Sequence, residues 1–146
     1  MDNSKYDTLR LENQLCFPLY AASREIIKNY KPFLDELDLT YTQYITLMLH
    51  WENKNMRVKE IGEMLYLDSG TLTPLLKKLE GKGLITRARS PEDERNLNVT
   101  ITEAGEKLRD RALDIPTKIM ATTGLTAEET EALYHLLYKV LSAVKE

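Results

Sequence analysis

The spacing of apolar residues changes from helical to strand-like midway along the chain, and this change restricts the fold more than any other feature. A short helical stripe over residues 58–65 is followed, after a polar turn at 66–69, by a leucine stripe over 72–79. Residues alternate in character over 85–90 and again over 97–102, on either side of a polar stretch at 91–96. The second pattern indicates two strands of a β-hairpin. Helix, tight turn, helix and hairpin in this order predict a winged helix-turn-helix.

Further helical stripes flank this centre. One covers residues 19–30 and is expected to end before Pro32, and a second, over 44–51, is apolar almost all round and should lie in the core. After the hairpin, Thr102 could cap a helix that Pro116 should end or kink. Thr126 and Glu129 have capping-box spacing ahead of a long stripe over 133–144. We therefore predict a mostly α-helical fold with a small β-hairpin wing.

Length and composition place the chain among single-domain globular proteins. It has 146 residues, of which 42 % are hydrophobic and 29 % are charged. No apolar run approaches the roughly 20 residues of a membrane helix, and the polar first ten residues lack a signal-peptide core. The single cysteine cannot form an internal disulfide, so we expect a cytoplasmic protein.

The net charge of −3 is unevenly distributed. Residues 53–95 hold nine Lys or Arg and seven Asp or Glu, a net charge of +2, whereas the rest hold eleven and sixteen, a net charge of −5. Local charge matters more than total charge for phosphate contact, and the net-basic segment coincides with the helix-turn-helix.

One face of the leucine helix is suited to the major groove of DNA. It carries Gly70, Thr73, Pro74, Lys77 and Gly81, with Lys78 at its border, so it is small and polar at one end and basic at the other. Since Pro74 lacks an N–H, we expect it in the first turn, with the helix beginning near 69–71 and presenting free N–H groups to a phosphate. The hairpin adds three arginines that could reach DNA: Arg87, Arg89 and Arg95. Composition alone would equally allow a solvated helix with ordinary surface lysines; the order of the elements favours DNA.

Residues 40–105 resemble the MarR family of bacterial winged-helix repressors. The resemblance is carried by Leu39-Thr-Tyr-Thr-Gln-Tyr44, Asp68-Ser-Gly-Thr-Leu-Thr-Pro-Leu-Leu-Lys-Lys-Leu79, Gly83-Leu-Ile-Thr-Arg87, Asp93-Glu-Arg95 and Leu97-Asn-Val-Thr-Ile-Thr-Glu-Ala-Gly105. Upstream, Leu11-Glu-Asn-Gln-Leu-Cys-Phe17, Leu19-Tyr20 and Tyr30-Lys-Pro32 are similar to the organic-hydroperoxide-sensing branch, the OhrR regulators. The resemblance covers nearly the whole chain and is looser after residue 115.

The resemblance implies a homodimeric DNA-binding repressor without enzymatic activity or cofactor. Residues 8–38 and 103–146 would form the helical dimerisation region, and 39–102 the winged helix-turn-helix. A twofold dimer should read a pseudo-palindromic operator with half-sites about 10 base pairs, or a multiple of that, apart. By the family pattern, the groove-reading positions are Ser69, Thr71, Thr73, Pro74 and Lys78, and Arg95, oriented by Asp93, would enter the minor groove. Taken alone, Asp93 could equally be a plain loop carboxylate.

Cys16 is the candidate sensing residue. It precedes the first helical stripe by one step, and Pro18 suits a first turn, so the sulfur should lie at a helix N-terminus that favours the thiolate. The alternative is an inert, buried thiol. In the resembled branch two tyrosines of the opposite subunit hydrogen-bond the sulfur; they correspond to Tyr30 and Tyr41, with Tyr20 a nearby third. These tyrosines could instead be ordinary core residues.

A peroxide mechanism follows from this resemblance. A hydroperoxide would oxidise the Cys16 thiolate to a sulfenic acid, and the tyrosine network would lose its partner. The recognition helices, which are the leucine helices over 72–79 of the two copies, would then no longer fit their half-sites. Two-cysteine members next form an intersubunit disulfide, a route closed to a chain with one cysteine. The sulfenic acid would instead take a low-molecular-weight thiol, cyclise to a sulfenamide or over-oxidise.

Three rival functions remain open. A MarR-type repressor could be released by a phenolic or aromatic ligand, with Cys16 a bystander. A one-cysteine peroxidase is disfavoured, because the alternating strands and helices of a thioredoxin-like sheet are missing. A metal sensor is disfavoured because His50 and His135, the only histidines, share no ligand motif with the cysteine, and we expect both to be structural or solvated.

Overall fold

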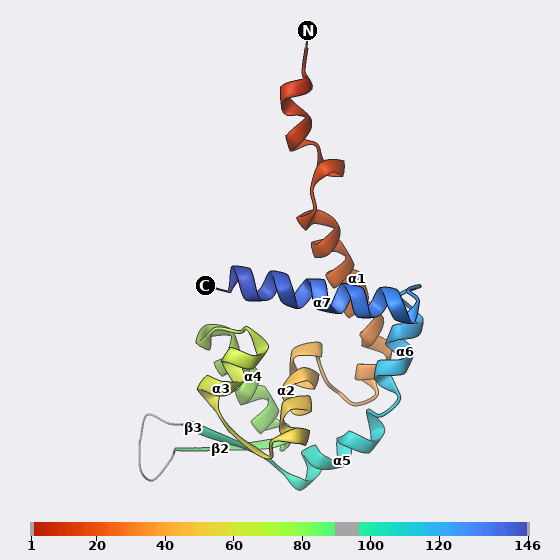
Figure 1. Cartoon of the computed structure of the whole chain (residues 1–146). Coiled ribbons are helices and arrows are strands. Elements are labelled where there is room, and N and C mark those ends of the chain that lie inside the picture. The colour runs from red at the N-terminus through yellow and green to blue at the C-terminus, as the bar shows by residue number, and fades with distance from the viewer. Residues whose placement is uncertain (1, 90–96, 146) are drawn as a thin grey trace. The chain divides into compact units, whose positions relative to one another are not determined.

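A computed structural model describes residues 2–89 and 97–145 (Figure 1). It divides into two compact units: Met1–Asn29 with Ile115–Glu146, and Tyr30–Asp114. The longest helix, α1 (Cys16–Asp35), contributes residues to both units.

The unit Tyr30–Asp114 is a winged helix-turn-helix. After α1 come α2 (Tyr41–Glu52), β1 (Asn55–Arg57), α3 (Val58–Leu65), α4 (Ser69–Gly81), β2 (Ile85–Arg89), β3 (Leu97–Ile101) and α5 (Glu103–Arg111). The strands form an antiparallel sheet in the order β1-β3-β2, with Arg87 and Met56 paired to Val99 from its two sides. The predicted mostly helical fold with a hairpin wing is confirmed. The sequence analysis missed β1, because three residues are too few to show a period of two.

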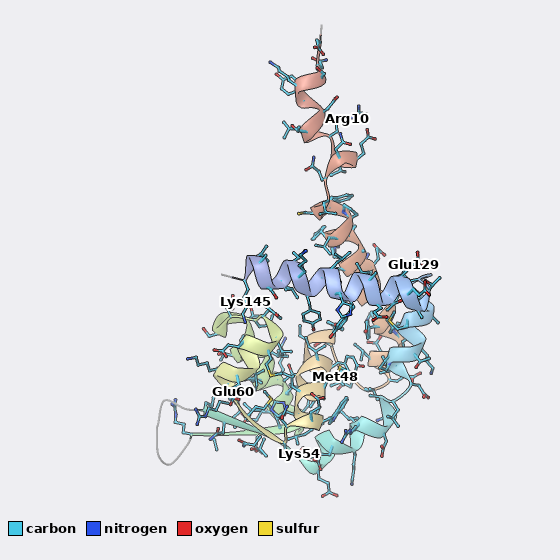
Figure 2. The ribbon with its side chains drawn as sticks, viewed as in Figure 1. Arg10, Met48, Lys54, Glu60, Glu129 and Lys145 are labelled. Carbon is cyan, nitrogen blue, oxygen red and sulfur yellow. The ribbon has the colours of Figure 1, made fainter. Side chains whose placement is uncertain are left out.

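The core of this unit lies between α2, α3, α4 and the sheet. Its most deeply buried apolar side chains are Leu47, Ile61, Leu72, Leu76, Leu79, Ile85 and Val99. Residues 44–51 of helix α2 lie in or partly in the core as predicted, except for Met48 (labelled in Figure 2), which is 40 % exposed. The Trp51 indole N–H donates to the carbonyl oxygen of Gly105 at 3.0 Å and thereby fastens α2 to α5. A β-carbon at Gly105 would collide with the carbonyl oxygen of Leu84, so α5 packs closely against the start of β2.

Two of the expected helix boundaries are wrong, both at prolines. Helix α1 continues through Pro32 to Asp35, because Leu34 is buried in the core and the helix ends only where Asp38 adopts a left-handed conformation with φ 56°. The N–H of Leu39 then donates to the carbonyl oxygen of Leu34, which closes the helix end. Pro116 ends no helix: α5 stops at Arg111, and Pro116 lies in the first turn of the next helix, where its missing N–H costs nothing.

The other unit is built from the two ends of the chain. It contains the 3₁₀ turns η1 (Ser4–Leu9) and η2 (Leu11–Asn13), the first part of α1, α6 (Ile115–Ala121) and α7 (Ala127–Val144). The predicted capping box of α7 is present: the Thr126 hydroxyl accepts from the N–H of Glu129, and the Glu129 carboxylate accepts from the N–H of Thr126. Across the described ranges, no helix is both long and apolar enough to span a bilayer.

Candidate DNA-binding surface and redox site

Helix α4 separates its apolar residues from the residues predicted to read DNA. Leu72, Leu75, Leu76 and Leu79 are buried. The solvent face carries the predicted set Ser69, Thr71, Thr73, Pro74, Lys77 and Lys78, all of them exposed. One helix therefore presents hydroxyls near its N-terminus and two ammonium groups further along, as a major-groove element does.

The start of α4 lies where the sequence placed it, but two details differ. Pro74 is the sixth residue of the helix and not part of its first turn, so the carbonyl of Gly70 loses its usual donor within the helix. Asp68 caps the helix by accepting from the N–H of Thr71 at 2.8 Å, and this hydrogen bond holds the pKa of the Asp68 carboxyl below its usual value. The expectation of free N–H groups at this end is therefore wrong at Thr71.

The described part of the wing places Arg87 against α4. Its guanidinium Nη2 lies 3.0 Å from the Glu80 carboxylate, and the Arg87 side chain is only 20 % exposed. The structure therefore gives Arg87 a local partner that the sequence analysis did not anticipate; its contact with DNA stays a prediction. Arg89 ends the same strand and is exposed. Asp93 and Arg95 lie outside the described residues.

Cys16 is the first residue of α1, and its thiol is exposed. Pro18 falls in the first turn, as predicted, so it does not shift the helix start away from the cysteine. Tyr20 lies one turn further along the same helix, where its hydroxyl accepts from Arg24 Nη1 at 3.2 Å and its ring lies beneath the Arg24 guanidinium. An exposed thiol can be reached by an oxidant in solution, whereas a buried one cannot.

The structure brings Tyr30 and Tyr41 together in the winged-helix unit, Tyr30–Asp114. Their ring centroids are 4.9 Å apart, and Tyr44 lies 5.8 Å from Tyr30 and 6.3 Å from Tyr41. Burial, and to a lesser extent the neighbouring Tyr41 and Tyr44, raises the pKa of Tyr30 to about 12; burial likewise raises the pKa of Tyr44. The shifts extend to higher pH the range over which the Tyr30 and Tyr44 phenols stay protonated and able to donate a hydrogen bond.

Tyr44 is the member of this cluster that sequence reasoning missed. It was assigned to the core stripe, and it is buried, but its ring also contacts Tyr30, Tyr41 and Trp51. The signal was available: Tyr41 and Tyr44 are three residues apart, so they share one face of a helix. Tyr20 belongs to the unit that contains Cys16, whereas the three clustered tyrosines belong to the winged-helix unit.

The two histidines have structural or solvated environments. His50 is buried, with its ring nitrogens 2.9 Å from the carbonyl oxygen of Thr46 and 3.3 Å from that of Val99, so it joins α2 to the sheet. His135 is exposed and lies 3.7 Å from the Glu131 carboxylate. Among the residues with described positions, no group of three His, Cys, Asp or Glu side chains could hold a metal ion.

The family model and the curated relatives that match this chain all describe transcriptional regulators. The family model described as transcriptional regulator SarA/Rot matches residues 28–112. The organic hydroperoxide resistance transcriptional regulator of Bacillus subtilis is 51 % identical over 146 residues, covering 100 % of this chain and 99 % of the relative. The regulator SarZ of Staphylococcus epidermidis is 46 % identical over 123 residues, covering 84 % of this chain and 83 % of the relative.

Two solved structures of a DNA-bound regulator match nearly the whole chain. The structure of reduced AbfR bound to DNA has a TM-score of 0.79 and 34 % identity, covering 97 % of this chain and 99 % of that one. Overoxidised AbfR bound to DNA has a TM-score of 0.78 and 34 % identity, covering 96 % of this chain and 98 % of that one. AbfR is a protein of Staphylococcus epidermidis.

Proposed function

The chain belongs to the MarR-type family of transcriptional regulators that includes the SarA/Rot and organic-hydroperoxide-resistance regulators, and on that premise we propose that it is a DNA-binding repressor which senses organic hydroperoxides through Cys16. One observation carries the proposal. The single thiol is exposed at the first residue of α1, in a chain 51 % identical over its full length to an organic hydroperoxide resistance regulator.

The repressor acts on DNA as a dimer. The helical regions 8–38 and 103–146 join two copies, and region 39–102 of each copy contacts one half-site. Support comes from α7, whose exposed large apolar side chains are Leu133, Tyr134, Leu136, Tyr138, Val140 and Val144. The operator is a pseudo-palindrome whose half-sites lie about 10 base pairs, or a multiple of that, apart.

Each copy reads its half-site with α4 and its wing. Ser69, Thr71, Thr73, Pro74, Lys77 and Lys78 approach the major groove, and their common solvent face supports this assignment. Arg95 enters the minor groove with Asp93 orienting it, and Arg87 lies at the base of the wing. Hydroxyl and ammonium groups donate to base edges and phosphates, so this face suits a DNA duplex.

Release begins with oxidation of Cys16. The thiolate attacks the distal oxygen of the hydroperoxide, the O–O bond breaks, and the products are a sulfenic acid and an alkoxide that takes a proton to become the alcohol. In the reduced dimer, Tyr30 and Tyr41 of one copy hydrogen-bond the sulfur of the other, and Tyr20 lies near its own copy's sulfur. The contact between the Tyr30 and Tyr41 rings supports this role, because it places side by side two phenols, and a phenol can donate a hydrogen bond to a thiolate.

The oxidised cysteine is then resolved by a small molecule. The chain has one cysteine, so the sulfenic acid condenses with a low-molecular-weight thiol, releasing water and forming a mixed disulfide, unless it cyclises or over-oxidises. Such thiols are supplied by the cytoplasm, where we place this regulator.

The test is DNA binding of the reduced protein, measured by fluorescence anisotropy at one stated salt concentration on the DNA flanking its own gene. Wild type should bind tightly, release on treatment with cumene hydroperoxide, and rebind after dithiothreitol. Cys16→Ser should bind equally well and ignore the peroxide. Met64→Leu is the matched control, because Met64 is an exposed, oxidisable sulfur on α3, and this variant should respond as wild type does.

Two results would count against the proposal. A Cys16→Ser protein that is still released by peroxide would remove the cysteine from the mechanism. Release by a phenolic compound, with no response to peroxide, would identify a ligand-gated repressor instead. Mass spectrometry of the released protein tests the resolving step: complete, persistent release by one equivalent of peroxide, with only sulfenic acid at Cys16, would exclude the need for a small thiol.

A further inference from the structure

Glu80 connects the recognition helix to the wing. It is the penultimate residue of α4, and its carboxylate makes two hydrogen bonds to one residue of β2. Oε2 accepts from the backbone N–H of Arg87 at 3.2 Å, and Oε1 accepts from Arg87 Nη2 at 3.0 Å. The carboxylate therefore holds the main chain of the strand as well as its side chain.

The backbone hydrogen bond lies on the outer edge of the wing. In the sheet order β1-β3-β2, the described part of the chain pairs strand β2 with β3 alone, and Arg87 lies opposite Val99. In an antiparallel pair, N–H groups of alternate residues point away from the partner strand. The Arg87 N–H is one of these, and it donates to the Glu80 carboxylate. The carboxylate thus accepts the hydrogen bond that a carbonyl of a further strand would otherwise accept.

The side-chain contact is partly shielded from water. The Arg87 side chain is 20 % exposed and that of Glu80 is 39 % exposed. The hydrogen bond from the Arg87 guanidinium holds the pKa of the Glu80 carboxyl below its usual value. Arg87 Nε is buried and has no hydrogen-bond partner among the described residues, so the guanidinium is turned toward α4 and not extended into solvent.

We propose that Glu80 is a positioning residue for DNA binding, which fixes the wing relative to α4 so that both engage one operator half-site. The inference rests on the proposed DNA-binding function. It also gives Arg87 a different role from the predicted direct contact with DNA: Arg87 acts through Glu80.

The sign of the effect separates positioning from simple electrostatics. Removing a carboxylate beside a DNA-binding surface normally strengthens binding, because it removes repulsion of the phosphates. If Glu80 positions the wing, its removal weakens binding instead. Glu63 provides the matched control, because it is an exposed carboxylate on α3 in the same unit, for which no ion pair is found among the described residues.

The experiment measures the dissociation constant of the reduced full-length dimer for its operator over a range of salt concentrations. Glu80→Gln should weaken binding about tenfold and lower the salt slope by about one to two per dimer, as wing cations disengage from phosphates. Glu63→Gln should bind as tightly as wild type or slightly more tightly. Arg87→Ala and Glu80→Ala should each weaken binding, and the double variant should be no weaker than either single one.

A shortened duplex distinguishes positioning from a general loss of structure. It keeps the major-groove half-sites but lacks the flanking base pairs that the wing reaches. On it, the difference between Glu80→Gln and wild type should disappear, whereas a partly unfolded variant would remain weak on both duplexes. Glu80→Gln binding the full operator as tightly as wild type, or more tightly, would overturn the inference; failure of wild type to bind would instead overturn the proposed function.

Discussion

Helices α4 and α7 carry similar stripes of leucine but have opposite environments. Helix α4 buries four leucines in 13 residues, whereas α7 has 18 residues, all of them described, and buries none. The stripe of α4 is covered by other elements of its own unit, while Leu136 in the stripe of α7 is 59 % exposed. An apolar stripe therefore predicts a helix but does not say whether its partner lies in the same chain. We infer that a second copy covers α7.

The largest expected effect is the loss of operator binding when the apolar face of α7 can no longer contact a second copy. Leu136→Glu combined with Val140→Glu places two charges on the apolar face of α7 and should prevent two copies from associating. Operator affinity should then fall to the non-specific level, about a thousandfold or more, because one copy cannot span two half-sites. Analytical ultracentrifugation and operator titration measure the two effects.

Ser142→Glu is the control, because Ser142 lies on the opposite side of the same helix from the apolar stripe. It should leave both the dimer and DNA binding intact. If the double variant stays dimeric and binds normally, the partner of α7 is not a second copy, and the comparison with α4 needs another explanation.

A smaller effect distinguishes α4 from α7 by how the free energy of unfolding depends on protein concentration. Leu79 has no exposed surface, so Leu79→Ala should lower the free energy of unfolding by about 3 kcal/mol, through lost burial and the cavity it leaves. In urea titrations this loss should be the same at low and high protein concentration. Leu136→Ala should instead act mainly through dimerisation, so its effect should grow as the protein is diluted. A Leu136→Ala effect independent of concentration would contradict this distinction.

The sequence predicts the fold wherever local chemistry decides it. The leucine spacing of α4, the alternation of β2 and β3, and the caps at Thr102 and Thr126 are local signals, and each element begins where its signal lies. The signals failed where burial outweighed them. Pro32 remains inside α1 because Leu34 beyond it is buried in the core, and burial of that kind cannot be read from a proline alone.

The candidate site was predictable as a set of residues but not as a set of contacts. The exposed face of α4 follows from helical spacing, since positions that do not face the core face solvent. The contact between Glu80 and Arg87 depends on how α4 and β2 pack, and seven residues of separation give no periodic signal for it. Tyr44 was correctly placed in the core, but its contact with Tyr30 joins two helices and needed the structure.

The smallest effect concerns the tyrosine cluster, in which the partly buried Tyr30 contrasts with the solvent-exposed apolar residues of α7. The pKa of Tyr30 is raised from 10.0 to about 12 in the folded chain. Between these values the unfolded chain gives up a proton that the folded chain keeps, so rising pH favours unfolding; the stabilisation is complete below pH 10 and is lost as pH approaches 12. Wild type should therefore lose stability more steeply than Tyr30→Phe between pH 10 and 11.5, in urea titrations at fixed ionic strength.

Trp51→Phe is the control, because it removes a buried hydrogen bond without removing a titrating group, and should lower stability by about 1 kcal/mol at every pH. Equal slopes for wild type and Tyr30→Phe would mean that the Tyr30 phenol is as well hydrated in the folded chain as in the unfolded one, and the cluster would then resemble the exposed face of α7 more than the core beneath α4.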